Sequence, residues 1–239
     1  MSPEANALLA RYQAEPYSLE PLGAYERWAL GFFVEPGNLL NPHLDTTLQL
    51  DVTDARARYE AEHASATGAS FSAFLTWSLL DTLREHPAFN LRLVEGNWYL
   101  LRNPSLYFPV AVGGRQRFCD VLLDDVVGLA WSEFAARYRA GVERAMQGSF
   151  APVSDLEFLL STFVGNLPGL RFTGLTLHSV VHAHTKPFFY FGRRYYSAGG
   201  SAAGERLLVP FAAKLHHATS DLYVLDRLIQ DLARRWGGD

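Results

Sequence analysis

The sequence predicts an α+β domain in which helices pack on a large mixed sheet. Segments with strand-like alternation and segments with helical periodicity both occur, but they do not follow the strict strand–helix order of a wholly parallel sheet. The 239 residues, 49% of them hydrophobic, suffice for one domain with a large core, or at most two small ones. No linker or repeat divides the chain, so we expect a single domain over residues 1–239, with residues 1–24 as an N-terminal extension of uncertain structure.

The first half of the chain predicts a short helix, a strand and two further helices before a strand-rich stretch. Residues 5–15 can form a short helix, although prolines and a glycine interrupt the segment that follows. Residues 46–52 alternate apolar and polar side chains, as in a half-exposed strand. A polar helix is expected over residues 54–65, and a helix with an apolar stripe over residues 70–86. Residues 97–112 carry the aromatic residues typical of strands.

The second half predicts more strands and a final helix. A strand is expected over residues 118–123 and an amphipathic helix over residues 130–146. Aromatic and β-branched residues dominate residues 162–196, which indicates further strands. The apolar run 207–213 is expected to form a buried or edge strand, and the helical spacing of apolar residues over 225–236 predicts the last helix.

Composition excludes several classes of partner and compartment. A formal net charge of −4 gives no reason to expect binding to nucleic acid or to an anionic membrane. The single cysteine, Cys119, rules out an intrachain disulfide and favours a reducing compartment, and we expect it to be a small buried residue. No apolar stretch is long enough to span a bilayer, and the first residues do not resemble a signal peptide. We therefore expect a soluble, cytoplasmic protein.

Candidate proton chemistry is concentrated near the C-terminus. His216 and His217 follow the apolar run, and Asp221 comes four residues after His217. Histidine has the side-chain pKa nearest neutrality, so a histidine at a strand-to-helix junction can remove a proton from a hydroxyl or thiol and return it. The alternative is an ordinary hydrogen-bonded histidine, with Asp221 as the N-cap of the final helix. The residue pattern alone leaves both interpretations open.

The remaining histidines and the glycines do not predict a metal or nucleotide site. On a strand, His178 and His182 would lie about 13 Å apart, too far to share one ion, whereas His182 and His184 would lie about 6.6 Å apart. No acidic residue or cysteine lies nearby to complete a site, so we expect no metal. The chain contains no Gly-x-Gly-x-x-Gly motif, phosphate loop or Gly-x-Ser-x-Gly motif, which disfavours dinucleotide and NTP binding and gives no nucleophilic serine of that type.

The C-terminal segment His216-His217-Ala218-Thr219-Ser220-Asp221-Leu222-Tyr223 resembles the active-site signature of the chloramphenicol acetyltransferase family, which is His-His-Ala-x-x-Asp-Gly followed by an aromatic residue. Further stretches resemble that family in type, order and spacing, across most of the chain. They are Phe71-Ser72-Ala73-Phe74-Leu75, Glu85-His86-Pro87-Ala88-Phe89-Asn90-Leu91-Arg92, Val94-Glu95-Gly96, Trp131-Ser132-Glu133-Phe134, Asn166-Leu167-Pro168 and Gly192-Arg193-Arg194-Tyr195-Tyr196. The specificity of the resemblance comes from the series rather than from any one motif.

The resemblance implies a fold, a reaction and a set of residues. It implies a two-layer sandwich with helices on a large mixed sheet, and a homotrimer whose active sites lie between subunits. His217 would be the general base that deprotonates an acceptor hydroxyl for attack on acetyl-CoA, and Asp221 would support the site structurally through an arginine. Tyr25, Phe32 and Phe33 fall in the region that lines the acceptor pocket of that family; the alternative is that they are ordinary core residues.

The chain departs from the family pattern at several positions. Leu222 stands where the family has glycine, and would be strained if the backbone there needed a positive φ. Gly165 and Tyr190 stand where the family has a serine and a threonine that help to stabilise the oxyanion, so backbone amides, Asn166 or the Tyr190 hydroxyl would have to substitute. The arginine that pairs with the aspartate has no clear counterpart, Arg27 being the nearest.

Two functional hypotheses therefore stand side by side. The first is an acetyl-CoA-dependent O-acetyltransferase for a small hydroxylated acceptor, with chloramphenicol, and hence antibiotic resistance, as the leading candidate. The second is a catalytically weak or silent trimer of the same fold that binds a small molecule. A related signature occurs in the acyltransferase core of 2-oxo acid dehydrogenase complexes, which is disfavoured because the chain shows no lipoyl module and no Ala/Pro-rich tether.

Overall fold

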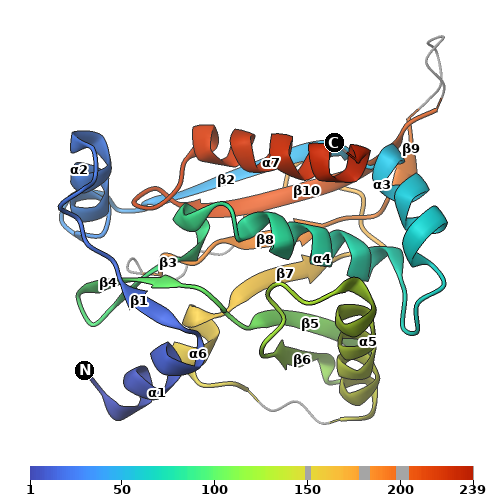
Figure 1. Ribbon diagram of the computed structural model, residues 1–239, viewed down its shortest axis with the longest axis horizontal. Coiled ribbons are helices and arrows are strands. Elements are labelled where there is room, and N and C mark those ends of the chain that lie inside the picture. The colour runs from blue at the N-terminus through green and yellow to red at the C-terminus, as the bar shows by residue number, and fades with distance from the viewer. Residues whose placement is uncertain (149–151, 178–183, 198–204, 239) are drawn as a thin grey trace.

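A seven-stranded mixed sheet forms the centre of the computed structural model, which describes residues 1–148, 152–177, 184–197 and 205–238 (Figure 1). Across the sheet the strands are β2 (His43–Asp51), β10 (Leu207–His216), β8 (Phe188–Phe191), β7 (Thr162–Asn166), β5 (Leu106–Gly113) and β6 (Arg117–Leu123), and the short β9 (Tyr195–Tyr196) also pairs with β10. Strand β7 is parallel to β5 and β8, whereas β10 is antiparallel to β8 and β2. The prediction of an α+β fold on a large mixed sheet is confirmed.

Strand β10 lies inside the sheet, between β2 and β8, and so is buried rather than at an edge. Its pairing with β2 is continuous from Leu208 opposite Asp51 to His216 opposite His43. All of its residues except Leu208 are buried, which explains why the sequence shows an apolar run instead of strict alternation. The last residue of this strand, His216, immediately precedes the candidate base.

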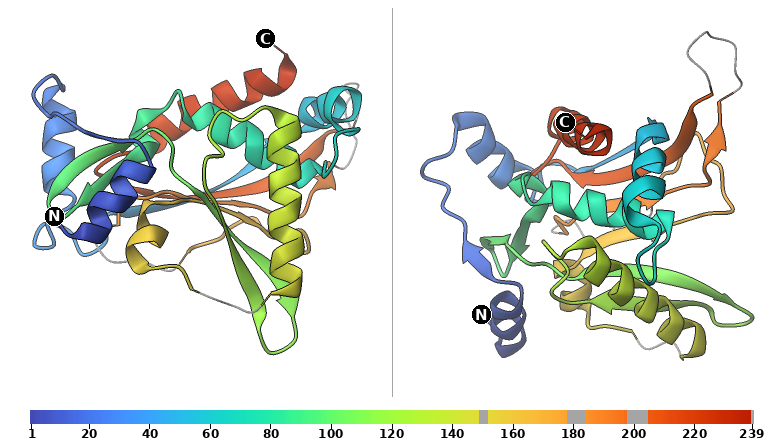
Figure 2. Two further views of the ribbon diagram at one scale, coloured as in Figure 1. Left: turned by 60° about the horizontal axis from the view of Figure 1, so that its bottom comes forward. Right: turned by 45° about the vertical axis from the view of Figure 1, so that its right-hand side comes forward.

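Helices cover one face of the sheet (Figures 1 and 2). They are α3 (Thr53–Arg58) with its continuation η1 (Tyr59–His63), α4 (Phe71–Leu83), α5 (Trp131–Gln147) and α7 (Leu222–Gly237). The main core lies between this layer and the sheet, and its best-buried side chains, each at most 1% exposed, include Phe74, Leu79, Phe134, Phe189, Val209, Phe211 and Leu228. Burial of each such side chain contributes roughly 1.5–3 kcal/mol, so this layer holds the sheet in place.

A smaller sheet closes the end of the molecule where the N-terminus lies (Figure 1). It contains β1 (Ala14–Pro16), β4 (Asn97–Leu101) and β3 (Leu91–Val94), and β3 follows the 3-10 helix η2 (Pro87–Asn90). Helices α1 (Pro3–Arg11) and α6 (Asp155–Leu160) pack together beside it, and α2 (Ala24–Phe32) packs on its other side. Residues 1–24 thus contain α1 and β1, and β1 is hydrogen-bonded to β4.

Two predicted helices end earlier than expected. The N-terminal helix, predicted over residues 5–15, ends at Arg11 because Gln13 adopts a positive φ of 51° and the next residues pair with β4. The polar helix predicted over residues 54–65 changes at Tyr59 into one π-helical turn, in which the Ala64 amide donates to the Tyr59 carbonyl at 2.8 Å.

Within the described ranges, no helix combines the length and the apolar composition needed to cross a bilayer.

Candidate active site

The turn after β10 is built around His216. This side chain is 0% exposed, and its Nδ1 accepts a hydrogen bond from the Ala218 amide at 3.1 Å. Its carbonyl accepts from the Thr219 and Ser220 amides at 3.1 and 3.0 Å. The first histidine of the pair is therefore a structural residue that fixes the path of the chain past the second.

His217 faces a cavity and is only partly buried. Its backbone amide donates to the Pro42 carbonyl at 2.8 Å, and its ring packs on the ring of Phe33 with centroids 4.2 Å apart and planes tilted by 32°. Its Nδ1 is buried and has no hydrogen-bond partner among the described residues. The second ring nitrogen, Nε2, is not among the buried unpaired atoms of the described residues.

Asp221 is the N-cap of α7, which is the structural alternative that the sequence left open. Its Oδ1 accepts from the Val224 amide at 2.9 Å. No ion pair of Asp221 is found in the described parts of the chain, and the Arg27 guanidinium donates instead to the carbonyls of Glu20 and Leu22. An arginine partner for Asp221 is therefore absent within the described chain, while the cap itself ties the start of α7 to the turn that carries His217.

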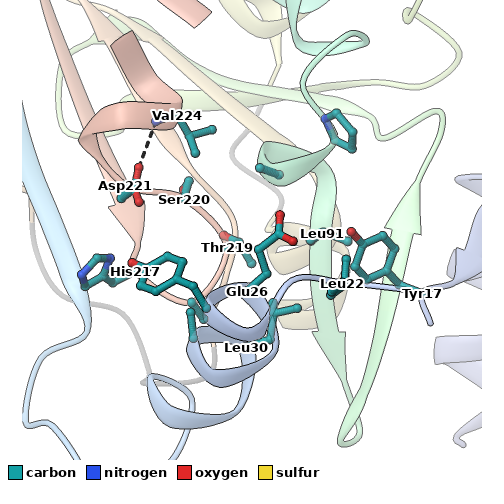
Figure 3. Close-up of a pocket in the computed structure, with 15 residues that line it drawn as sticks. Tyr17, Leu22, Glu26, Leu30, Leu91, His217, Thr219, Ser220, Asp221 and Val224 are labelled. Atoms are coloured by element: carbon teal, nitrogen blue, oxygen red, sulfur yellow. Dashed lines mark hydrogen bonds between the residues drawn. The ribbon is translucent and has the colours of Figure 1, made fainter. Parts of the chain in front are cut away.

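A cavity of about 270 Å³ lies between α2, the end of β10 and the start of α7 (Figure 3). His217 and Asp221 line it together with Tyr25, so it brings together three residues that were singled out in the sequence. The rest of the wall is mostly apolar. It includes Leu22, Ala29, Leu30, Leu91, Ala218 and Val224. This composition, apolar walls with a few polar groups, is typical of a small-molecule site.

Helix α2 presents a chain of aromatic rings that leads to His217. Tyr25 lines the cavity and is 55% exposed. Phe33 is buried against His217, and Phe32 packs on Phe33 with centroids 5.2 Å apart but does not line the cavity. Trp28, which the sequence analysis did not single out, is 49% exposed and stacks on Phe32 at 4.7 Å. Helical spacing places Trp28 one turn from Tyr25 and from Phe32, and that spacing is the signal that could have identified it.

The oxyanion candidates lie away from this cavity. Gly165 and Tyr190 face each other on β7 and β8, and Tyr190 pairs with Ala212 on β10. His217 comes five residues after Ala212, which corresponds to about 16 Å along a strand. The side chain of Asn166 is directed towards α4, where its Nδ2 donates to the Ser72 hydroxyl at 3.2 Å. One copy of the chain therefore does not assemble all the predicted catalytic residues around one point.

Gly165 and Tyr190 fit one another closely. A Cβ atom added to Gly165 would lie 2.4 Å from both Cδ1 and Cε1 of the Tyr190 ring, far inside contact distance. The ring of Tyr190 therefore occupies the space that a side chain at position 165 would need. Burial raises the pKa of the Tyr190 phenol, so its hydroxyl keeps its proton at neutral pH and can donate a hydrogen bond.

Leu222 is the first residue of α7, and it is not among the residues with positive φ in the described ranges. The turn therefore does not require glycine at this position, and the strain considered from the sequence does not arise. The side chain is 56% exposed, so leucine is also accommodated without a steric conflict.

A group of basic and aromatic side chains lies near Asn166. The guanidinium of Arg194 donates to Ser72 at 3.1 Å and lies over the Phe71 ring, with Arg56 over the same ring. Burial, and then the neighbouring charge of Arg56, lowers the pKa of Arg194. No carboxylate pairs with Arg194 in the described part of the chain, so this position would favour an anionic group such as a phosphate.

Histidines 178 and 182 lie outside the described residues. The ring of His184 is partly buried, and burial, followed by the charges of Lys186 and His43, lowers its pKa to about 4. No set of three or more histidine, cysteine or acidic side chains suited to a metal ion occurs among residues with described positions. Cys119 is buried in the main core.

Comparison with curated sequences matches about half of the chain. No family profile matches the chain. Uroporphyrinogen decarboxylases from Francisella philomiragia and Francisella tularensis are each 30% identical to it over 124 residues, which is 47% of this chain and 34% of those proteins. The chain thus spans about a third of the length of the curated relatives that it matches.

Comparison with solved structures covers almost the whole chain. A chloramphenicol acetyltransferase aligns with a TM-score of 0.73 and 19% identity over 92% of this chain and 97% of that one. The cubic core of a pyruvate dehydrogenase multienzyme complex aligns with a TM-score of 0.61 and 18% identity over 82% of each chain. A truncated 2-oxoacid dehydrogenase catalytic core from Thermoplasma acidophilum aligns with a TM-score of 0.60 and 17% identity over 92% of this chain and 98% of that one.

The sequence comparison and the structure comparison point to different proteins. The structural alignment covers 92% of this chain, whereas the sequence match covers 47% of it. The fold is therefore that of chloramphenicol acetyltransferase and of the acyltransferase cores, as the sequence resemblance predicted.

Proposed function

We propose that the chain is an acetyl-CoA-dependent O-acetyltransferase that uses His217 as its general base. The observation that carries the proposal is the position of His217. In a fold shared with acyltransferases, this histidine directly follows strand β10 and lines a mostly apolar cavity of about 270 Å³. The small hydroxylated acceptor enters this cavity, and chloramphenicol is the leading candidate. Acetylation of an antibiotic hydroxyl would then confer resistance, and the single cysteine favours a cytoplasmic enzyme.

The reaction needs only a base, two aligned substrates and donors for the oxyanion, because a thioester is already a reactive acyl donor. His217 Nε2 takes the proton of the acceptor hydroxyl, and the oxygen attacks the thioester carbonyl carbon. The tetrahedral intermediate collapses with cleavage of the carbon–sulfur bond, and the imidazolium returns the proton to the CoA thiolate. The products are the acetyl ester and free CoA, with atoms and charge balanced.

A second copy of the chain supplies the other half of the site. His217 and the pair formed by Gly165 and Tyr190 are separated by about 16 Å along the sheet, too far for one substrate carbonyl to contact both. A closed homotrimer brings the histidine of one subunit to the oxyanion donors of the next. The protonated hydroxyl of Tyr190 is the donor in place of the missing serine and threonine.

The basic group near Asn166 would hold a phosphate of CoA. Arg56 is already paired with Glu60 at 2.5 Å, whereas Arg194 has no acidic partner within the described chain, so the Arg194 guanidinium is the cation that would meet the phosphate. This fit supports CoA as the donor. No metal is needed for the chemistry proposed.

A thiol-release assay tests the proposal. Purified protein is incubated with acetyl-CoA and chloramphenicol, and free CoA thiol is measured over time. We expect His217→Ala to lose turnover by at least two orders of magnitude, because a positioned general base contributes about 10²–10⁴-fold. The control is His63→Gln, in the helical layer and away from the cavity, which is expected to keep turnover. Equal thiol release by the wild type and His217→Ala would contradict the proposal that His217 is the general base.

Gly165 and Tyr190 favour a second candidate, a catalytically weak or silent trimer that binds a small molecule. Loss of one oxyanion donor costs about 10²–10³-fold in rate. CoA binding without thiol release for any acceptor would favour this second function.

A further inference from the structure

We propose that the ring of Tyr190 restricts the acyl donor to short chains, so that the site takes acetyl-CoA and excludes longer acyl-CoA thioesters. The inference rests on the proposed function, in which the Tyr190 hydroxyl donates to the oxyanion. The acyl chain is bonded to the same carbon atom as that oxygen, so it starts next to the donor. The space around the Tyr190 ring therefore limits the length of the chain.

The ring of Tyr190 fills the space beside Gly165. The parallel register of β7 and β8 sets Gly165 opposite Tyr190. A Cβ atom added to Gly165 would lie 2.4 Å from Cδ1 and Cε1 of the ring and 3.1 Å from Cζ. The glycine therefore leaves no open space next to the Tyr190 hydroxyl, because the ring itself occupies that space.

Three buried rings hold the Tyr190 ring in this position. Phe163 precedes Gly165 by two residues on β7 and so lies on the same face, and its ring centroid is 5.1 Å from that of Tyr190. The rings of Phe188 and Tyr107 lie 5.1 and 5.6 Å from that of Phe163, and the three residues are between 2% and 7% exposed. The Tyr190 ring cannot turn towards Phe163 without displacing these rings, since a close-packed interior has little spare volume.

Lys186 ties the same rings to helix α6. It is 1% exposed, and its Nζ lies 3.2 Å from the ring centroid of Phe158 and 4.9 Å from that of Phe188. The same Nζ donates to the Phe158 carbonyl, in the last turn of α6. The rings next to Tyr190 are thus held by a hydrogen bond as well as by apolar packing, and an acyl chain longer than acetyl would have to displace them.

Two donors that differ by two methylene groups test the inference. The Kd values of acetyl-CoA and butyryl-CoA are measured by calorimetry, which needs no acceptor, and kcat/KM is measured by thiol release with chloramphenicol. Tyr190→Thr removes the ring and keeps a hydroxyl, whereas Tyr190→Phe keeps the ring and removes the hydroxyl. Tyr190→Leu is a second variant without the ring, and circular dichroism checks the fold of each protein. Tyr99→Thr, on β4 and outside this group of rings, is the control.

We expect the wild type, Tyr190→Phe and Tyr99→Thr to prefer acetyl-CoA by about tenfold or more in Kd. The preference in kcat/KM should reach about 100-fold, since one added methylene group changes discrimination by about 10–200-fold. Tyr190→Phe should turn over both donors more slowly with the preference unchanged. Tyr190→Thr and Tyr190→Leu should lose most of the preference.

Equal Kd values for the two thioesters in the wild type, an unchanged preference in both variants without the ring, or loss of the preference in Tyr190→Phe would overturn the inference. Equal turnover of both donors would also overturn it, but would leave the acetyltransferase proposal standing. Selective binding of acetyl-CoA without any thiol release would support the inference and remove the acetyltransferase proposal. Binding of neither thioester would overturn both.

Discussion

At the residue scale, the fit of Tyr190 over Gly165 explains two departures from the family pattern as one coupled change. A side chain at position 165 and the ring at position 190 cannot occupy the same space, since a Cβ atom at Gly165 would lie 2.4 Å from ring carbons. Restoring the serine alone should therefore fail. The two positions have to be changed together.

We expect Gly165→Ser to destabilise the protein by about 1–3 kcal/mol, because overpacking forces neighbouring atoms to shift. Tyr190→Thr in the same chain should relieve most of that cost, which gives a favourable coupling energy in a double-mutant cycle. Urea denaturation of the wild type, both single variants and the double variant measures it. Additive free energies of unfolding in the four proteins would contradict the steric coupling.

Sequence reasoning placed some residues of the site and missed others. His217, Asp221 and Tyr25 were singled out from the sequence, and they line one cavity. Glu26 also lines this cavity but was not singled out, since a single acid at the start of a helix is usually a solvated cap. The contact of Gly165 with Tyr190 was also missed, because it depends on the register between two parallel strands far apart in the sequence.

At the element scale, the N-cap of α7 links a helix to the position of His217. Asp221 accepts from the Val224 amide, and the helix that follows buries Leu225, Leu228, Leu232 and Trp236 against the core. The cap satisfies one of the amides that the first turn of any helix leaves unpaired. A change at Asp221 should therefore affect stability and the candidate site together.

We expect Asp221→Ala to lower the free energy of unfolding by about 1 kcal/mol, while Asp221→Asn stays within a few tenths because asparagine caps equally well. Thermal and urea denaturation measure both variants. If the N-cap hydrogen bond of Asp221 holds His217 in position, thiol release should fall in Asp221→Ala and stay close to wild type in Asp221→Asn. Full turnover in Asp221→Ala, despite its lower stability, would show that the N-cap of α7 does not contribute to the activity of the site.

Elements with a clear apolar period were predicted well, and short or exposed ones were not. The helix at α5 and the strand at β10 were located to within a few residues, since each buries a continuous set of side chains. Helix α2 was not predicted, because Tyr25 and Trp28 are exposed and its apolar residues do not form a single buried stripe. Strand β1 has three residues, too few for any period to show.

At the scale of the whole molecule, the distance between the two groups of candidate residues decides how the site is assembled. If each site takes its base from one subunit and its oxyanion donor from the next, two inactive variants should restore each other. A site contained in one chain cannot be rescued in this way.

We expect His217→Ala and Tyr190→Ala to be inactive or nearly so separately, and to regain up to about a quarter of wild-type thiol release when unfolded, mixed equally and refolded together. In a random equal mixture, a quarter of all interfaces between subunits would join an intact base to an intact donor. Light scattering of the refolded mixture checks for a mass of three chains. Absence of rescue in a trimer that has exchanged subunits would contradict a site shared between chains.

The two walls of the cavity are held by different interactions, one by backbone hydrogen bonds and the other mainly by side-chain packing. His217 follows a strand that is hydrogen-bonded on both sides, next to the edge strand β2 of the large sheet. The facing helix α2 is held mainly by the side chains of Ala29, Leu30 and Phe33 against β3, β4 and Ala218. New acceptors would therefore be accommodated by sequence drift in residues 24–33 while the reactive nitrogen stays in place. Laboratory evolution towards bulkier alcohols would accordingly enrich changes in this helix and leave residues 207–221 intact.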